Sequence, residues 1–219
     1  MKNPWSALPQ SPPYWLPEDR PYIEAWNQRR PDAFRLRSEA LPEPFVGRRD
    51  APVVVLQRNP AWRDDDQPHP PDLDRAVRGN LTDNPELHIH PGFLERFPNS
   101  AGWWRPRWKW VQRESGLSWD ELARRILVVE SHGYYSKRWA AFPFTLPSQR
   151  YSYRLVEEAI TRGAVVLVMR GEGDWEAAVP SLASHGRRFR VRSWQAAYVS
   201  PQNLGEDGFQ TFSKHWPEM

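Results

Sequence analysis

The sequence predicts a mixed α/β protein in which helices cover both faces of a central parallel sheet. Three short apolar runs, at residues 51–56, 126–130 and 164–169, are rich in β-branched residues and lack the polar alternation of a half-exposed strand. Segments with the apolar spacing of helices separate these runs. Because strands that alternate with helices favour parallel pairing, we expect a three-layer sandwich of helix, sheet and helix.

Composition narrows the class of protein. The chain has 219 residues, enough for one sizeable core, and no cysteine, which excludes disulfides and iron–sulfur clusters. We therefore expect the protein in the reducing cytoplasm. We also expect it to be a monomer. No apolar stretch approaches the ~18 residues of a membrane span, so we expect no membrane partner. The net charge of +3 is too small to indicate nucleic-acid binding by itself.

Residues 1–40 are expected to form an arm and a short helix that pack on the main domain, residues 41–219. Prolines crowd the first half of the chain but are interleaved with tryptophans, which favours ordered irregular structure over disorder. Asp19 is a candidate cap for a helix that runs to about residue 30, with Tyr22 and Trp26 on one face.

The first buried strand ends at Asn59 and Pro60, because proline cannot donate to the strand ladder and disfavours helix in the residue before it. Asn59 therefore follows the carboxyl end of a strand, where parallel sheets present side chains to ligands. An asparagine here equally suits an ordinary turn. Residues 64–84 are polar and rich in proline, and we expect them to form a loop.

The rest of the chain continues the alternation. The segment from Ser118 carries a capping box with Glu121, and Gly163 supplies a helix stop. Helices are expected at about 103–115, 118–125, 148–163 and 175–178, and a strand at the sheet edge at 188–192.

Motifs at both ends of the chain resemble those of the uracil-DNA glycosylase superfamily. Residues 198–204 read Tyr-Val-Ser-Pro-Gln-Asn-Leu, and Gly-Phe and Phe-Ser-Lys follow at 208–209 and 212–214. The family closes with a His-Pro-Ser-Pro loop and the same two short motifs. It opens with a strand that leads into a catalytic Asp or Asn followed by proline, as in residues 53–60. The resemblance covers residues 42–215 and implies a glycosylase-like fold and a base-excision enzyme without a cofactor, acting on DNA or a nucleotide.

The resemblance also implies roles for residues in the two loops. Asn59 would position the water that attacks the sugar carbon. Trp62 would stack on an extruded base, although packing explains it nearly as well. Tyr198 stands where the family has its catalytic histidine, so a phenol would donate to the leaving base.

Further substrate contacts are expected at the strand ends and in the closing loop. Glu130 replaces a base-reading amide and would act as an acceptor only, or else pair with an arginine. Gln202 and Asn203 occupy the place of the wedge that enters a duplex. Tyr134 and Tyr135 would line the wall. The expected substrate-binding residues are Trp62, Glu130, Tyr134, Tyr135, Arg170, Ser200, Gln202 and Asn203. Four residues should converge on one cleft, namely Asn59, Glu130, Arg170 and Ser200.

Several alternatives stay open. Tryptophans alternate with Arg105, Arg107, Lys109 and Arg113, as suits phosphate contact with base stacking, or an amphipathic helix. His88 and His90, with Asp64, Asp65 and Asp66, raise the idea of a metal site, but we expect none. In place of an enzyme, the protein could be a non-catalytic module that binds nucleic acid or a nucleotide, which the missing histidine favours. A third option is a protein-interaction role through residues 1–20.

Overall fold

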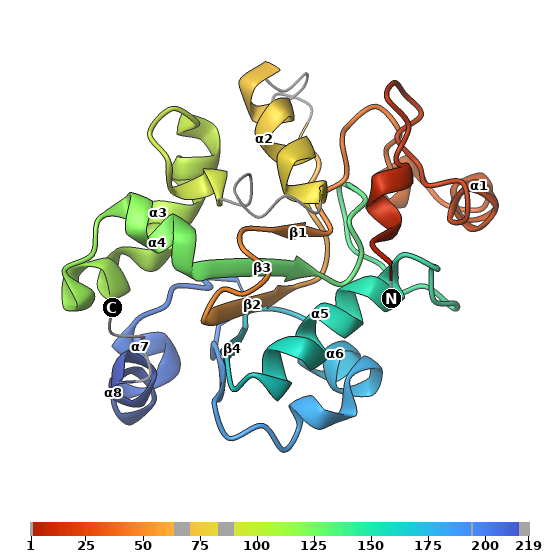
Figure 1. Cartoon of the computed structure of the whole chain (residues 1–219). Coiled ribbons are helices and arrows are strands. Elements are labelled where there is room, and N and C mark those ends of the chain that lie inside the picture. The colour runs from red at the N-terminus through yellow and green to blue at the C-terminus, as the bar shows by residue number, and fades with distance from the viewer. Residues whose placement is uncertain (1, 64–70, 83–89, 194, 215–219) are drawn as a thin grey trace.

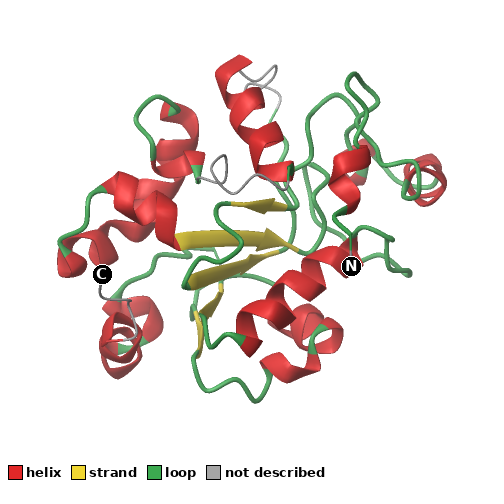
Figure 2. Cartoon of the chain, in the orientation of Figure 1, coloured by secondary structure: helices red, strands yellow, loops and turns green. Residues whose placement is uncertain are grey.

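The structure is a computed structural model, and it describes residues 2–63, 71–82, 90–193 and 195–214. The strands lie at the centre of the molecule and helices surround them (Figures 1 and 2). The strands are β1 Phe45–Val46, β2 Val53–Gln57, β3 Ile126–Glu130, β4 Val165–Val168 and β5 Arg188–Arg190. The helices are α1 Arg20–Gln28, α2 Pro71–Leu81, α3 Pro98–Ser115, α4 Trp119–Arg125, α5 Gln149–Thr161, α6 Glu172–Ala178, α7 Pro201–Leu204 and α8 Glu206–Lys214. Within these described residues, no helix is long and apolar enough to span a membrane.

The five strands form one sheet in the order β1-β3-β2-β4-β5. Strand β2 pairs in parallel with β3 and with β4, β5 pairs in parallel with β4, and β1 runs antiparallel to β3. The three predicted buried strands are thus confirmed as parallel strands of one sheet, with β5 at its edge. The chain passes from β2 to β3 on one side and then to β4 on the other, which makes the gap between β2 and β4 a topological switch point.

Burial on both faces explains the apolar runs. Every residue of β2, β3 and β4 is buried, as parallel strands between two layers of helices require. Helix α3 contributes the fully buried Trp108 to the core, and α6 contributes Trp175. The Trp175 indole donates a hydrogen bond to the Gln57 carbonyl oxygen at 2.9 Å, which ties α6 to the end of β2. The structure is a mixed α/β fold with a mostly parallel sheet.

The prediction of a loop over residues 64–84 is wrong for part of that segment. Residues 71–81 form α2, in which Leu73, Val77 and Leu81 are buried at helical spacing. The helix begins with Pro71 and carries acidic residues in its first turn, both of which suit a helix N-terminus. Three apolar residues among many polar ones indicate a helix only weakly. The prolines around this segment favoured a loop instead.

Strand β1 was also not predicted, because only two residues pair. Gly47 follows it with φ +108° and packs on the backbone of β3: a Cβ atom on this residue would lie 2.1 Å from the Ile126 carbonyl oxygen. Only glycine fits so close an approach. Helix α3 begins five residues earlier than expected, and the closing motif folds into α7 and α8.

A buried polar network fixes the N-terminal arm to the domain. The Tyr134 hydroxyl donates to Asp19 Oδ2 at 2.7 Å and accepts from the Leu16 amide at 3.2 Å. The Ser148 amide donates to Asp19 Oδ1 at 3.0 Å. Asp19 precedes α1 as expected, yet its side chain makes no capping hydrogen bond, because both carboxylate oxygens serve this network instead. Burial raises the pKa of Asp19.

Replacing Tyr134 by phenylalanine should lower the free energy of unfolding by about 1–3 kcal/mol, because a buried Asp19 oxygen loses its donor. Urea unfolding of both proteins measures the difference. Tyr198→Phe is the matched control, since this ring is 40% exposed, and its effect should stay within about 0.5 kcal/mol. A Tyr134→Phe variant as stable as the wild type would contradict the role of the network.

Candidate functional site

A basic hollow of about 390 Å³ opens at the carboxyl ends of β2, β4 and β5. Its size falls in the range of small-ligand sites, and it lies at the switch point of the sheet. Its charged lining residues are Arg58, Arg170, Glu172, Arg190 and Arg192, and the remaining ones are Val168, Met169, Gly171 and Val191.

The strand ends hold these arginines in place through the backbone. The Arg170 amide donates to the Leu56 carbonyl at 3.3 Å, and the Val191 amide donates to the Val168 carbonyl at 3.2 Å. The Arg192 amide donates to the Asn203 carbonyl at 2.9 Å. Backbone hydrogen bonds between neighbouring segments therefore continue past the strand ends. They hold the backbone of Arg170 and Arg192 in place.

The charges of the hollow are not balanced. Glu172 pairs with Arg190 at 2.9 Å, and Arg58 lies 3.5 Å from Asp174. In the part of the chain that the structure describes, neither Arg170 nor Arg192 forms an ion pair, and Arg170 Nε is buried without a hydrogen-bond partner. An excess of guanidinium groups in a recess is the arrangement that binds an anion.

Helix α3 brings a further arginine to this edge. The Arg107 guanidinium carbon lies 3.8 Å from the centre of the Trp103 ring and 5.6 Å from that of the Tyr198 ring. Burial lowers the pKa of Arg107, and the charge of nearby Arg170 lowers it further. Arg107 thus connects the hollow to Tyr198. Arg107 belongs to the predicted basic and aromatic run on α3.

Asn59 follows β2 as expected and holds a neighbouring loop. Its Nδ2 donates to Ser136 Oγ and to the Pro60 carbonyl, each at 3.0 Å. In the described part of the structure its Oδ1 makes no hydrogen bond. Asn59 does not line the hollow.

Trp62 lies in a small cluster with Ala40 and Tyr135 and is only 9% exposed. Its ring meets the Tyr135 ring edge-on at 6.3 Å, while the Tyr135 hydroxyl donates to Glu43. Tyr134 is 1% exposed and holds the arm. All three aromatic residues are buried in the described structure.

The residues of the closing loop fix its shape. Ser200 Oγ accepts from the Asn203 amide at the start of α7. The Asn203 side chain is buried, accepts from the Ser193 amide at 2.7 Å and donates to the Ala196 and Tyr198 carbonyls. Gln202 is exposed. Neither Ser200 nor Asn203 lines the hollow, so of the four residues expected in one cleft only Arg170 does.

Glu130 ends β3 beside Gln57 and is 8% exposed, with Oε2 buried and unpartnered. Burial and the nearby Glu43 raise its pKa well above the ordinary value, against the opposing effect of Arg170. The expectation of an acceptor only does not fit this environment, because a carboxyl group that keeps its proton is also a donor. Glu130 forms no ion pair with an arginine of the described residues.

Three lining arginines, Arg58, Arg190 and Arg192, were missed. Each lies in or just after a strand, so the rule that ligands bind beyond strand ends could have found them.

The predicted metal ligands are only partly described. His90 is buried and accepts from the Gly92 amide at 3.0 Å, and burial lowers its pKa to about 3. His88 and residues 64–66 lie outside the described residues. Among the described ones, no group of three or more His, Cys, Asp or Glu side chains could hold a metal ion.

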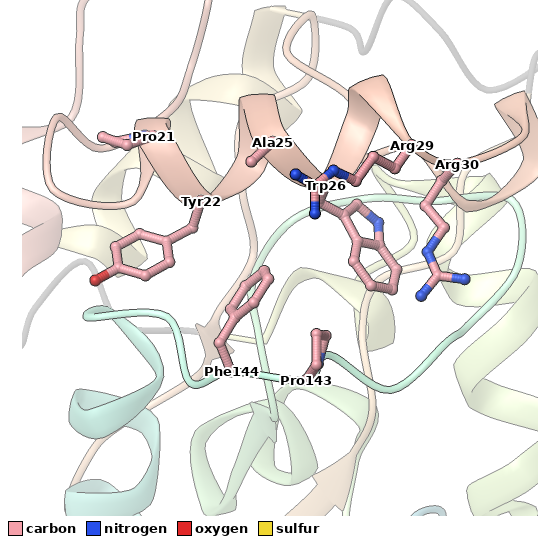
Figure 3. Close-up of a pocket in the computed structure, with 8 residues that line it drawn as sticks. All are labelled: Pro21, Tyr22, Ala25, Trp26, Arg29, Arg30, Pro143 and Phe144. Carbon is pink, nitrogen blue, oxygen red and sulfur yellow. The ribbon is translucent and has the colours of Figure 1, made fainter.

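A second hollow, of about 470 Å³, opens between α1 and the segment around Phe144 (Figure 3). Its walls are mainly apolar, and the Arg30 guanidinium lies 4.1 Å from the Trp26 ring centre at one end. It contains no acid–base pair and no carboxylate. We therefore take the basic hollow as the candidate site.

Comparisons with known proteins assign no function: no family model, curated protein or solved structure matches the chain.

Replacing Glu130 by glutamine should change how stability depends on pH. The pKa of Glu130 is raised in the folded state, so the folded protein binds this proton more tightly than the unfolded chain does. Proton binding to Glu130 therefore contributes fully to stability at a pH below 4.5, the pKa of this group in the unfolded chain. This stabilisation is lost as the pH rises from 4.5 through the pKa of Glu130 in the folded protein. Wild type should lose stability relative to Glu130→Gln over that window, by up to about 1.4 kcal/mol per pH unit.

Urea unfolding between acid and alkaline pH checks this. The exposed Glu114→Gln provides the control and should show no such trend. A stability difference between wild type and Glu130→Gln that is the same at every pH would show that this carboxyl ionises normally.

Proposed function

We propose that the protein binds a phosphate-bearing ligand, a nucleic acid or a nucleotide, at the carboxyl edge of its sheet. The observation that carries the proposal is the pair of arginines, Arg170 and Arg192, in a hollow of about 390 Å³ without carboxylate partners in the described structure.

The chemistry of arginine supports phosphate in particular. A guanidinium presents several N–H groups in one plane and binds phosphate through two hydrogen bonds at once. Arg107 and Arg170 lie near each other although their charges repel, and Arg107 is partly buried. An anion between such groups would relieve the repulsion and supply the missing acceptors.

The glycosylase-like fold belongs to the same proposal. It is supported by the parallel arrangement of β2, β3 and β4 and by two polar residues, Asn59 just after β2 and Glu130 at the end of β3. Binding is favoured over base excision because Trp62, Ser200 and Asn203 are engaged inside the protein.

Neutralising Arg170 or Arg192 tests the binding proposal. Arg170→Gln and Arg192→Gln should each weaken binding of labelled single-stranded and double-stranded oligonucleotides, measured by fluorescence anisotropy. Each should also reduce the slope of log K against log salt by about 1, because each removes one phosphate contact. A nucleotide ligand should respond only mildly to salt.

Arg154→Gln is the matched control, since Arg154 lies on α5 in an exposed ion pair with Glu158 and the substitution changes the net charge equally. An equal effect of all three substitutions would mean that net charge alone drives binding. Unchanged affinity of Arg170→Gln and Arg192→Gln would contradict the proposed site.

Base excision is the second candidate, and one observation favours it. Two hydrogen bonds fix the Asn59 amide through Nδ2 and leave Oδ1 available to position a water. The prediction is an abasic product from at least one oligonucleotide that carries uracil, hypoxanthine, xanthine or an oxidised base, and its loss in Asn59→Ala. Cleavage at abasic sites by alkali detects it. Absence of product from every lesion, in single and double strands, would exclude this activity.

A further inference from the structure

Tyr198 is a large aromatic side chain that the fold holds at the surface. Its ring is 40% exposed, although the next residue, Val199, is fully buried. The Val199 amide donates to the Arg107 carbonyl at 2.8 Å, and Asn203 Nδ2 donates to the Tyr198 carbonyl at 2.9 Å. The backbone on both sides of the peptide is therefore fixed, and the exposed ring is part of an ordered surface.

The ring lies beside the arginines of the candidate site. Arg107 lies within 5.6 Å of the Tyr198 ring centre and has Trp103 on another side, at 3.8 Å. The charge of Arg170, which lines the basic hollow, also acts on Arg107. Positive charge and an exposed aromatic residue thus adjoin, which is the combination that binds a phosphate and stacks on its base.

We propose that the ligand of this edge is single-stranded nucleic acid, with a base stacked on Tyr198 and the neighbouring phosphates in the basic hollow. This inference rests on the proposed function and adds the class of ligand. A duplex hides its base faces, so an exposed ring can stack only on an unpaired base.

The length of the surface favours a strand over a mononucleotide. Trp103, Arg107 and Trp110 follow one another at helical spacing and share a face of α3. Trp110 is 44% exposed and has the Arg113 guanidinium 5.7 Å from its ring centre. Trp110 and Arg113 are thus a second aromatic and basic pair on α3. A strand of several nucleotides could contact this pair as well as Tyr198.

The experiment compares three labelled ligands of equal length: an oligothymidylate of about ten nucleotides, the same backbone made of abasic units, and a duplex. Wild type should bind the oligothymidylate about 5- to 150-fold more tightly than the abasic backbone, since stacking contributes ~1–3 kcal/mol per base. Tyr198→Ala should lose a large part of this preference, while Trp110 remains, and should bind the abasic backbone as wild type does. Tyr198→Phe should keep the preference, because the ring remains.

Tyr22→Ala is the matched control, because Tyr22 is 42% exposed on α1, among the residues that line the other hollow. It should leave all three affinities unchanged, and thermal unfolding should show that each variant is folded.

The outcomes separate two failures. Equal affinity of wild type for the oligothymidylate and the abasic backbone, or an unchanged preference in Tyr198→Ala, would overturn the stacking inference while leaving phosphate binding intact. Tighter binding of the duplex would overturn the single-strand assignment. No binding of any of the three would count against the proposed function itself.

Discussion

The parallel pairing of β2 with β3 on one side and β4 on the other is the constraint on which the rest of the structure depends. Its register sets Gln57 opposite Glu130 and Leu56 opposite Val168, so the three strands end at nearly the same level. A slip of one residue would turn the buried faces of these strands over and move the loops that follow them. The candidate site depends on this register, because Arg58 directly follows β2 and Arg170 follows β4 after Met169.

The polar residues beyond this edge divide into two groups. Asn59, Ser200 and Asn203 form hydrogen bonds within the protein and fix the loops. The guanidinium groups of Arg170 and Arg192 form no hydrogen bond or ion pair with the described residues and remain available to a ligand. The first group makes the edge rigid, and the second gives it its charge. A preorganised charged surface loses little entropy when a ligand binds.

Sequence reasoning predicted the sheet more accurately than the site. Continuous apolar runs identify β2, β3 and β4 because burial on both faces is a local requirement that the residues themselves express. Two-residue pairing in β1 leaves no such pattern, and α2 has only three buried apolar side chains among polar ones. These elements depend on packing with distant segments.

The site was harder to predict because side-chain roles depend on partners from elsewhere in the chain. The sequence predicted Asn203 as a surface wedge. In the structure its side-chain amide forms hydrogen bonds with the backbone of Ser193, Ala196 and Tyr198, and the sequence pattern gives no sign of these contacts. Glu130 looked like a hydrogen-bond acceptor, yet its burial raises its pKa and favours the protonated form. Arg170 was identified correctly as a residue of the edge, since its position follows from the end of β4 alone.

The central claim is that the carboxyl edge of the sheet is where the ligand binds. Titration of the isotope-labelled protein with a short oligonucleotide, followed by amide chemical shifts in NMR spectra, tests it most directly. We expect shifts at residues 57–59, 169–172 and 190–192 and around Tyr198. Shifts confined to α1 and the hollow next to Phe144, with the carboxyl edge unchanged, would contradict it.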